Sequence, residues 1–327
     1  MKTVQKFLCI ALCLLMYACG GQSNDSSLQT ATLVLDFVPN TNHTGFYVAL
    51  EKGWYEEEGI DLNIIEPGND GTSITLVGAG KGEFGVSYQE DVTYAKSAAD
   101  PLPITAIATI VQENTSGFVS LKEANIHSPK DFEGKVYAGW QAPSEESVIE
   151  AVMKQDGANI ANLTMVGADG SGFASLGKSV DLQWEFEGWA VIKGRMEGYD
   201  LNFIPLKDLD ERLNYYTPLI IGNNAVLEKN PELAKAFMRA TTKGFEFAIE
   251  NPKEAAAILS KYIPEYDLAF IEASQEYLSA RYQGNASKWG VMEDRVWDQY
   301  TSFMVESGLI LEMIPASAQY TNKFIEE

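Results

Sequence analysis

The stretch Leu35-Asp36-Phe37-Val38-Pro39-Asn40-Thr41-Asn42-His43-Thr44-Gly45 lies between an apolar run and an amphipathic segment. It holds a carboxylate, two amides and one of only two histidines in the chain. The apolar run predicts a strand over 32–37, and apolar residues at helical spacing predict a helix over 45–58. This strand–turn–helix junction begins the alternation that decides the fold. Its polar side chains suit the donors and acceptors of a small polar heterocycle.

The same alternation continues outward along the chain. Gly59 ends the first helix, and strands are expected at 62–65, 84–87 and 104–111, with helices at 73–79 and 91–99. Strands that alternate with helices predict a largely parallel sheet covered by helices.

A second, smaller cycle follows, and the end of the chain is mostly helical. Strands are expected at 118–121, 135–140, 163–166, 180–184 and 201–205. A helix is expected between Ser144, as its N-cap, and Gly157, just past its end, and a short helix at 172–177. After a strand at 219–226, helices are expected at 231–250, 252–262, 267–282 and 293–307.

These patterns predict an α/β protein with two lobes, each a mostly parallel sheet flanked by helices. We expect lobe I to be discontinuous, with residues 31–115 and 217–327, and lobe II to hold residues 116–216. A ligand would then lie in the cleft between the lobes, at the carboxyl ends of the strands.

The first residues predict a secretory signal peptide over 1–18. Two lysines precede the apolar run 7–18, which is shorter than the roughly 20 residues that a membrane-spanning helix needs. Ala18 and Cys19 are followed by a segment rich in Gly, Ser and Asn, a pattern similar to that of bacterial lipoproteins. We expect lipidation at Cys19, a flexible tether over 19–30 and an exported protein anchored to the cell envelope. An ordinary signal peptide with a chance cysteine is the alternative.

Composition argues against several classes of function. The formal charge of −22 repels nucleic acid and anionic lipid surfaces. All three cysteines (Cys9, Cys13 and Cys19) lie in or just after the leader, so the rest of the chain has no disulfide, thiol nucleophile or thiolate metal site. Two distant histidines do not make a typical zinc site. We therefore expect no metal, no cofactor, no catalytic residue and no nucleic-acid partner, and we expect a monomer.

Candidate ligand contacts in lobe I come from two strand ends. Asp36 could accept hydrogen bonds from an exocyclic amine or a protonated ring nitrogen. Asn40, Asn42 and His43 either contact the ligand or shape the turn that presents Asp36.

Two further candidates follow the strand at 84–87. Tyr88 could stack on a flat polar ring, and Gln89 could hydrogen-bond to it. Plain loop packing is the alternative for both.

Candidate contacts in lobe II are aromatic and acidic. Trp140 ends a strand and either stacks on the opposite ring face or belongs to the core. Glu185, Glu187 and Trp189 place a carboxylate beside an indole, which suits an aminopyrimidine, and Glu187 is slightly preferred over Glu185. A solvated acidic turn is the alternative reading of these three. Tyr215 and Tyr216, beside the second crossing between lobes, line either the cleft or the hinge.

The helix that follows Trp140 bears on the charge of the ligand. It begins Ser144-Glu145-Glu146, so two acids occupy the positive end where a phosphate or sulfonate would dock. This pattern argues against an anionic ligand.

The order of elements and four motifs resemble the SsuA/ThiY-like substrate-binding lipoproteins of ABC transporters. The narrowest motif is Pro39-Asn40-Thr41-Asn42-His43-Thr44-Gly45, which is similar to members that bind the pyrimidine precursor of thiamine. The others are Lys52-Gly53-Trp54-Tyr55-Glu56-Glu57-Glu58-Gly59-Ile60, Phe84-Gly85-Val86-Ser87-Tyr88-Gln89 and Gly177-Lys178-Ser179-Val180-Asp181. The likeness covers about residues 31–310 and implies a type II periplasmic-binding-protein fold, whose lobes close on a ligand.

The resemblance implies a binding protein that delivers a formylaminopyrimidine or hydroxymethylpyrimidine to an ABC permease. Stacking and carboxylate or amide hydrogen bonds would hold the ring. Riboflavin is an alternative ligand, while nitrate, sulfonate and taurine suit an acidic cleft less well. The fungal thiamine-pyrimidine synthases share the fold but use a cysteine-rich motif and a reactive lysine. This chain has no cysteine beyond Cys19, so we do not expect an enzyme.

Overall fold

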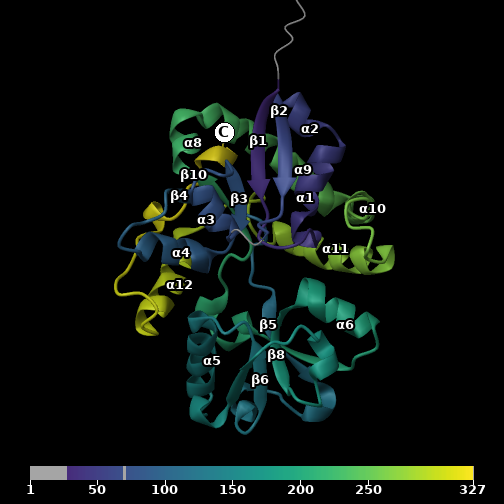
Figure 1. Ribbon diagram of the computed structural model, residues 1–327, viewed down its shortest axis with the longest axis vertical. Helices are drawn as coiled ribbons and strands as arrows, with labels where there is room; N and C mark the ends of the chain where they lie inside the picture. Colours follow the sequence, from purple (N-terminus) through teal and green to yellow (C-terminus); the bar gives the residue numbers. More distant parts are fainter. Residues whose placement is uncertain (1–27, 69–70, 327) are drawn as a thin grey trace, which may run out of the picture.

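The computed structural model describes residues 28–68 and 71–326, which form two lobes (Figure 1). The upper lobe in Figure 1 carries β1 to β4 and the last strand, β10, while β5 to β9 form the sheet of the lower lobe. The predicted signal peptide, Cys19 and most of the predicted tether lie outside the described residues. Within the described ranges, no helix has both the length and the apolar character needed to cross a membrane.

The sheet of lobe I has five strands in the order β2-β1-β3-β10-β4. Its strands are β1 (Gln29–Val34), β2 (Ile60–Ile65), β3 (Phe84–Ser87), β4 (Ile104–Thr109) and β10 (Leu219–Asn223). Strand β1 is parallel to both β2 and β3, whereas β10 is antiparallel to β3 and β4. The sheet is therefore mixed, with one reversed strand in an otherwise parallel array.

The sheet of lobe II repeats this plan in the order β7-β6-β8-β5-β9. Its strands are β5 (Ser116–Leu121), β6 (Val136–Gly139), β7 (Thr164–Gly167), β8 (Leu182–Phe186) and β9 (Leu201–Pro205). Here β5 is antiparallel to β8 and β9, and β6 is parallel to β7 and β8. The prediction of two mostly parallel sheets is confirmed.

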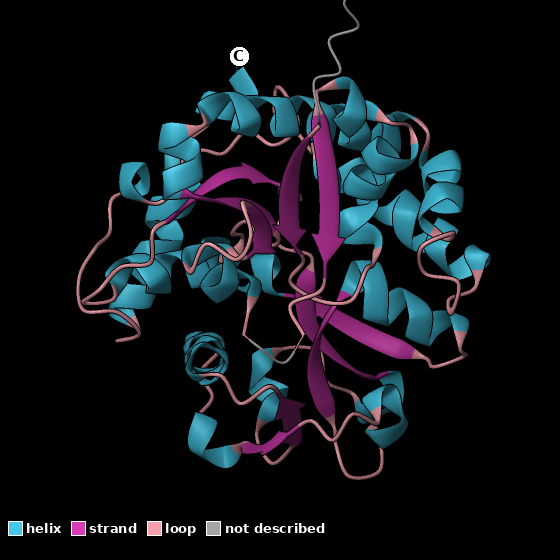
Figure 2. Ribbon diagram, turned by 45° about the horizontal axis from the view of Figure 1, so that its top comes forward, coloured by secondary structure: helices cyan, strands magenta, loops and turns pink. Residues whose placement is uncertain are grey.

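Helices cover both sides of the lobe I sheet (Figure 2). Those used below are α1 (Thr44–Glu51), α2 (Trp54–Glu57), α4 (Gln89–Ser97), α5 (Pro143–Gln155), α6 (Ile192–Met196), α8 (Asn224–Lys229), α9 (Pro231–Glu250), α11 (Leu268–Tyr282) and α12 (Asp294–Glu306). In Figure 1, α11 of lobe I lies just above α6 of lobe II.

Most predicted elements differ from the structure by a few residues, and in three of them the structure shows the reason for the difference. Strand β1 begins at Gln29, inside the predicted tether, because residues 29–34 pair in register with β2. The helix expected over 45–58 divides into α1 and α2 at Gly53, whose φ of 71° is left-handed. The strand expected over 219–226 ends at Asn223, because the Asn223 side chain accepts from Ala225 N–H and caps α8.

The two crossings between the lobes are tied to each other. Asn114, before β5, donates its amide to the Leu213 carbonyl at 2.9 Å, and its N–H donates to the Asn214 side chain at 3.0 Å. The side chain of Asn114 is fully buried. This one residue of the first crossing therefore holds the second crossing beside it.

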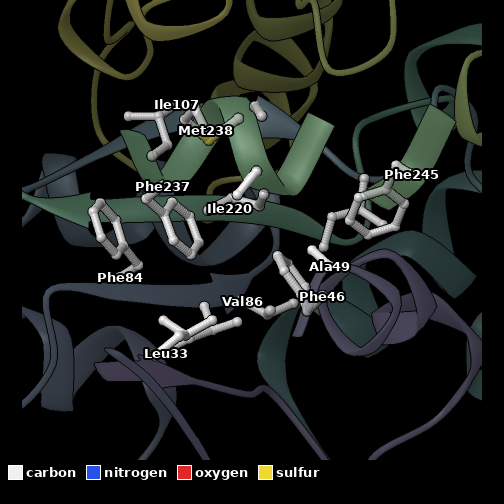
Figure 3. Packing of buried hydrophobic residues seen from close by; sticks show 14 of the residues in the cluster. Leu33, Phe46, Ala49, Phe84, Val86, Ile107, Ile220, Phe237, Met238 and Phe245 are labelled. Carbon is white, nitrogen blue, oxygen red and sulfur yellow. The ribbon is translucent and has the colours of Figure 1, made fainter. Parts of the chain in front are cut away.

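The lobe I core fixes α1, which follows the turn after β1. Phe84 and Phe237 stack with ring centroids 3.9 Å apart, and Phe46 meets the edge of Phe245 at 5.2 Å (Figure 3). A side chain at Gly244 of α9 would overlap the Gly45 carbonyl oxygen. Because these backbones approach so closely, α1 and the turn before it are held in a single position on lobe I.

Candidate functional site

Two adjoining cavities lie between the lobes, with volumes of about 380 and 240 Å³. Four aromatic residues line both cavities: Phe37 and Tyr88 from lobe I, and Trp140 and Phe186 from lobe II. Phe37 is 59% exposed and Trp140 is 56% exposed, although both are large aromatic side chains. Exposed rings on facing walls of a cleft offer stacking surfaces for a flat ligand.

The turn after β1 is built by its own polar side chains. Asn42 N–H donates to the Asn40 side chain at 2.9 Å, and Asn40 N–H donates to His43 Nδ1 at 3.2 Å. Because Nδ1 accepts, the ring hydrogen is assigned to Nε2, which donates to Asp36 at 2.7 Å. The turn therefore orients the histidine, and the histidine holds the carboxylate.

Asp36 has partners on both carboxylate oxygens. His43 donates to Oδ1, and the Tyr88 hydroxyl donates to Oδ2 at 2.7 Å. Burial alone would raise the pKa of Asp36, but the attraction of His43 and the hydrogen bonds from His43 and Tyr88 outweigh it, so its pKa lies below the usual value. Asp36 is thus held as an anion in the wall of the smaller cavity.

Glu185 faces the same cavity from the end of β8 and has no such partners. Among the described residues its carboxylate makes no hydrogen bond and no ion pair, and burial raises its pKa to about 7. Trp189 and Phe186 line the cavity beside it. A carboxyl group poised between its two charge states can accept a hydrogen bond from an amino group or share a proton with a ring nitrogen.

The larger cavity is acidic as well as aromatic. Glu90 and Asp91 in the first turn of α4 line one wall, and Glu145 in the first turn of α5 lines another. Burial, then the charge of Glu90, raises the pKa of Asp91 to about 7 against a long hydrogen bond from Ser87. Burial also raises the pKa of Glu90. No lysine or arginine lines either cavity among the described residues, so the cleft favours neutral or cationic aromatic ligands that donate hydrogen bonds.

The fold, the cleft and the sequence agree with one family. Residues 40–255 match the NMT1/THI5-like family, which is well over half of the chain. The chain belongs to the NMT1/THI5-like family.

Two curated relatives of this NMT1/THI5-like protein are similar over most of their length. A formylaminopyrimidine-binding protein of Halalkalibacterium halodurans is 28% identical over 302 residues, which is 86% of this chain and 86% of that protein. A 4-amino-5-hydroxymethyl-2-methylpyrimidine phosphate synthase of Legionella pneumophila is 26% identical over 311 residues, or 92% of this chain and 94% of that protein.

Solved structures share the fold. The alkanesulfonate-binding protein SsuA of Xanthomonas axonopodis pv. citri, bound to MOPS, superposes with a TM-score of 0.68 at 10% identity, covering 89% of this chain and 98% of that one. This likeness and the family match confirm the predicted resemblance and the two-lobed periplasmic-binding-protein fold.

The structure brings most of the predicted site residues of this NMT1/THI5-like chain to the cleft. The cavity walls include Asp36, Asn40, Asn42, Tyr88, Trp140, Glu185 and Trp189. Their roles as ligand contacts remain predictions. The hydrogen bonds of Asn40 and Asn42 show that both residues shape the turn, and both also line the smaller cavity.

Four predicted residues do not line the cavities. His43 is fully buried behind Asp36. Gln89 is also fully buried, because its amide donates to the Val296 carbonyl and accepts from Tyr216 N–H. Tyr216 is 1% exposed, and its hydroxyl accepts from the backbone of the segment before α12.

Glu187 is the fourth: Glu185 lines the smaller cavity and Glu187 lines neither cavity, so the geometry favours Glu185 over the slightly preferred Glu187. Arg195 binds Glu187 at 3.1 Å, and the Tyr277 hydroxyl donates to it at 2.9 Å. These partners draw the carboxylate away from the cavity that Glu185 lines. The prediction that Ser144 caps the helix after Trp140 is also wrong, since α5 begins at Pro143 with Ala142 as its N-cap and Ser144 lies inside the helix.

Several cleft residues were not predicted. They are Phe37, Glu90, Asp91, Glu145, Trp184 and Phe186. Phe37 had a usable signal, because a large aromatic side chain stands directly beside Asp36 in the polar junction. The acids of α4 follow Tyr88 and Gln89 and could have been found from the same strand end.

Proposed function

We propose that this chain is the extracytoplasmic substrate-binding protein of an ABC importer and that it captures an aminopyrimidine precursor of thiamine. One observation carries the proposal: Glu185, a carboxyl group with no partner among residues 28–68 and 71–326, lies beside exposed aromatic faces in a cleft between two lobes. The name of the Halalkalibacterium relative supports the ligand class, and the SsuA neighbours support the transport role.

The recognition we propose divides the work between stacking and hydrogen bonding. Aromatic side chains such as Trp140 and Phe37 would sandwich the ring. Glu185 would accept from the exocyclic amine and pair with the adjacent ring nitrogen. Asp36, held by His43 and Tyr88, would read a second polar edge of the ligand through its remaining lone pairs.

The competing functions differ in ligand or in chemistry. Riboflavin offers a stacking face and a polar edge, and it needs the larger cavity. Sulfonates and nitrate suit the acidic walls less well. The Legionella relative is named as a synthase. A synthase that uses a cysteine-rich motif would need cysteines, and this chain has none beyond Cys19.

Isothermal titration of the purified chain tests the binding function. Hydroxymethylpyrimidine, formylaminopyrimidine, riboflavin and taurine should be compared under one set of conditions. We expect the two aminopyrimidines to bind at least tenfold more tightly than the others. Tight binding of riboflavin or taurine with none of either pyrimidine would overturn the ligand assignment.

Two further measurements test the remaining parts of the proposal. Incubation with pyridoxal phosphate and iron should yield no pyrimidine product, and a product would show a synthase. Mass spectrometry of the chain made in bacteria should find a lipid on Cys19, and an unmodified Cys19 would overturn the anchor.

A further inference from the structure

The Glu145 carboxylate fills a ring of hydrogen-bond donors at the start of α5. Its Oε1 accepts from Trp140 N–H at 2.9 Å and from the Tyr137 hydroxyl, and its Oε2 accepts from Ala142 N–H at 3.2 Å. Backbone N–H groups at a loop and a helix start are the donors with which proteins bind phosphate and sulfonate. In this chain a side chain of the protein occupies that place.

The main chain is built around this carboxylate. A Cβ atom at Gly139 would overlap Glu145 Oε1 and would lie 2.5 Å from the Tyr137 hydroxyl oxygen. Glu145 itself is 1% exposed, although it lines the larger cavity. The backbone of β6 and of the loop after it therefore fixes the position of the Glu145 carboxylate. A flexible acid on the surface would have no fixed position.

The surroundings of Glu145 are acidic on the facing wall. Glu90 of lobe I lines the same cavity and accepts from the Tyr300 hydroxyl at 3.0 Å, and Asp91 lies in the same first turn of α4. The next acid of α5, Glu146, is exposed instead. A phosphate entering this cavity would find its donors occupied and would meet carboxylates on two sides.

We propose that Glu145 is a specificity-determining residue: its carboxylate acts as a built-in anion that keeps ligands with a phosphate or sulfonate group out of the cleft. The inference rests on the proposed aminopyrimidine function and narrows it to the ligand without a phosphate. Glu145 also positions Trp140, because its Oε1 holds the Trp140 N–H.

Titration of hydroxymethylpyrimidine and its monophosphate ester, into wild type and Glu145→Ser, tests this. Wild type should bind the ester on the order of 100-fold more weakly than the alcohol, since like charges placed together oppose binding. In Glu145→Ser the ratio of the two dissociation constants should fall at least about tenfold, because the freed N–H groups can donate hydrogen bonds to the phosphate oxygens. The ratio is the decisive readout, since a merely structural loss would weaken both ligands alike.

Glu146→Ser is the matched control, because it removes the same charge one residue later from an exposed side chain. Its ratio should equal that of wild type. An unchanged ratio in Glu145→Ser, or equal binding of alcohol and ester by wild type, would overturn the inference. If Glu145→Ser loses its circular-dichroism spectrum, Glu145→Gln keeps the size of the side chain and removes only the charge. Its ratio should also fall, but by less than in Glu145→Ser, because the amide still occupies the N–H groups; an unchanged ratio would overturn the inference.

A second probe separates this inference from the proposed function. If wild type binds neither pyrimidine, the aminopyrimidine function fails. Titration with inorganic phosphate, followed by phosphorus NMR, then tests Glu145 alone. Phosphate should bind Glu145→Ser and should bind neither wild type nor Glu146→Ser. Absence of binding to Glu145→Ser would overturn the inference whatever the ligand is.

Discussion

Asp36 and Glu185 are buried carboxylates that line the same cavity, one from each lobe, and they behave in opposite ways. Asp36 has a donor on each oxygen and a lowered pKa, whereas Glu185 has no hydrogen bond or ion pair in the described chain and a pKa raised to about 7. Burial is common to both, so the partners decide the outcome. The contrast separates an acid that supports the site from an acid that is free to bind.

Removing the partner of Asp36 should have the largest effect. His43→Leu leaves a buried carboxylate with one donor, and it should lower the free energy of unfolding by about 3 kcal/mol. Urea unfolding followed by tryptophan fluorescence measures this. The other histidine, His127, is exposed. His127→Ala should change the free energy of unfolding by less than about 0.5 kcal/mol. If the two substitutions had equal effects on stability, the conclusion that His43 stabilises the Asp36 carboxylate would be contradicted.

Neutralising Glu185 should act on binding and spare the fold. Glu185→Gln should weaken aminopyrimidine binding roughly 30-fold, about 2 kcal/mol, because a hydrogen bond to a charged group is lost. Its stability at pH 7 should equal or exceed that of wild type, since an unpaired buried carboxyl group is removed. Titration calorimetry and urea unfolding of the same preparation test both parts. If Glu185→Gln unfolds more easily but binds the ligand normally, then Glu185 supports the fold, as proposed for Asp36, and does not bind the ligand.

The pH dependence of stability should have opposite signs at the two acids. The pKa of Glu185 is raised on folding, so its contribution is complete below about pH 4.5 and is lost as the pH rises to about 7. Asp36, with a lowered pKa, contributes above its unfolded pKa, and that contribution is lost as the pH falls below it.

The Glu185→Gln variant isolates the first of these effects. Between pH 5 and pH 8, its unfolding free energy should gain roughly 2.5 kcal/mol on wild type. Urea unfolding at four pH values measures the difference, and the remaining pH dependence belongs to other groups such as Asp91. A constant difference would mean that Glu185 titrates normally.

Substitution of Glu187 should have the smallest effect on stability and on binding. It tests whether the position of the carboxylate in the cleft matters. Glu187 stands two residues from Glu185 but is paired with Arg195 and Tyr277 near the surface. Glu187→Gln should cost less than about 1 kcal/mol of stability, as is usual for partly exposed ion pairs. Ligand affinity should change less than about threefold. A larger loss of affinity than in Glu185→Gln would restore the sequence-based preference for Glu187.

Much of the fold was predictable because its signals are local. The bounds of β3, β9 and α9 match the expectations, and Pro231 marks the start of α9 as proline often does. The end of β10 was missed, although Asn223 and Asn224 interrupt the apolar run before Val226. What stops the strand is the Asn223 side chain, which caps the next helix.

The site was less predictable, because side-chain direction depends on distant partners. The prediction for Tyr88 and Gln89 used the same strand end, yet only Tyr88 reaches the cavity, because Val296 and Tyr216 hold Gln89 inward. A distant partner also explains why Glu185, and not Glu187, lines the cavity. Tyr277, which binds Glu187, lies on α11 of the other lobe, and no local pattern reports it.

The place of β10 constrains the order in which the chain can fold during synthesis. This strand lies between β3 and β4 and pairs with both, yet it follows the whole of the β5 to β9 sheet in the sequence (Figure 1). While a ribosome is still making that segment, β4 has no neighbour in its own sheet. The inserted lobe is therefore expected to mature first on the ribosome, and lobe I waits for residues 219–223.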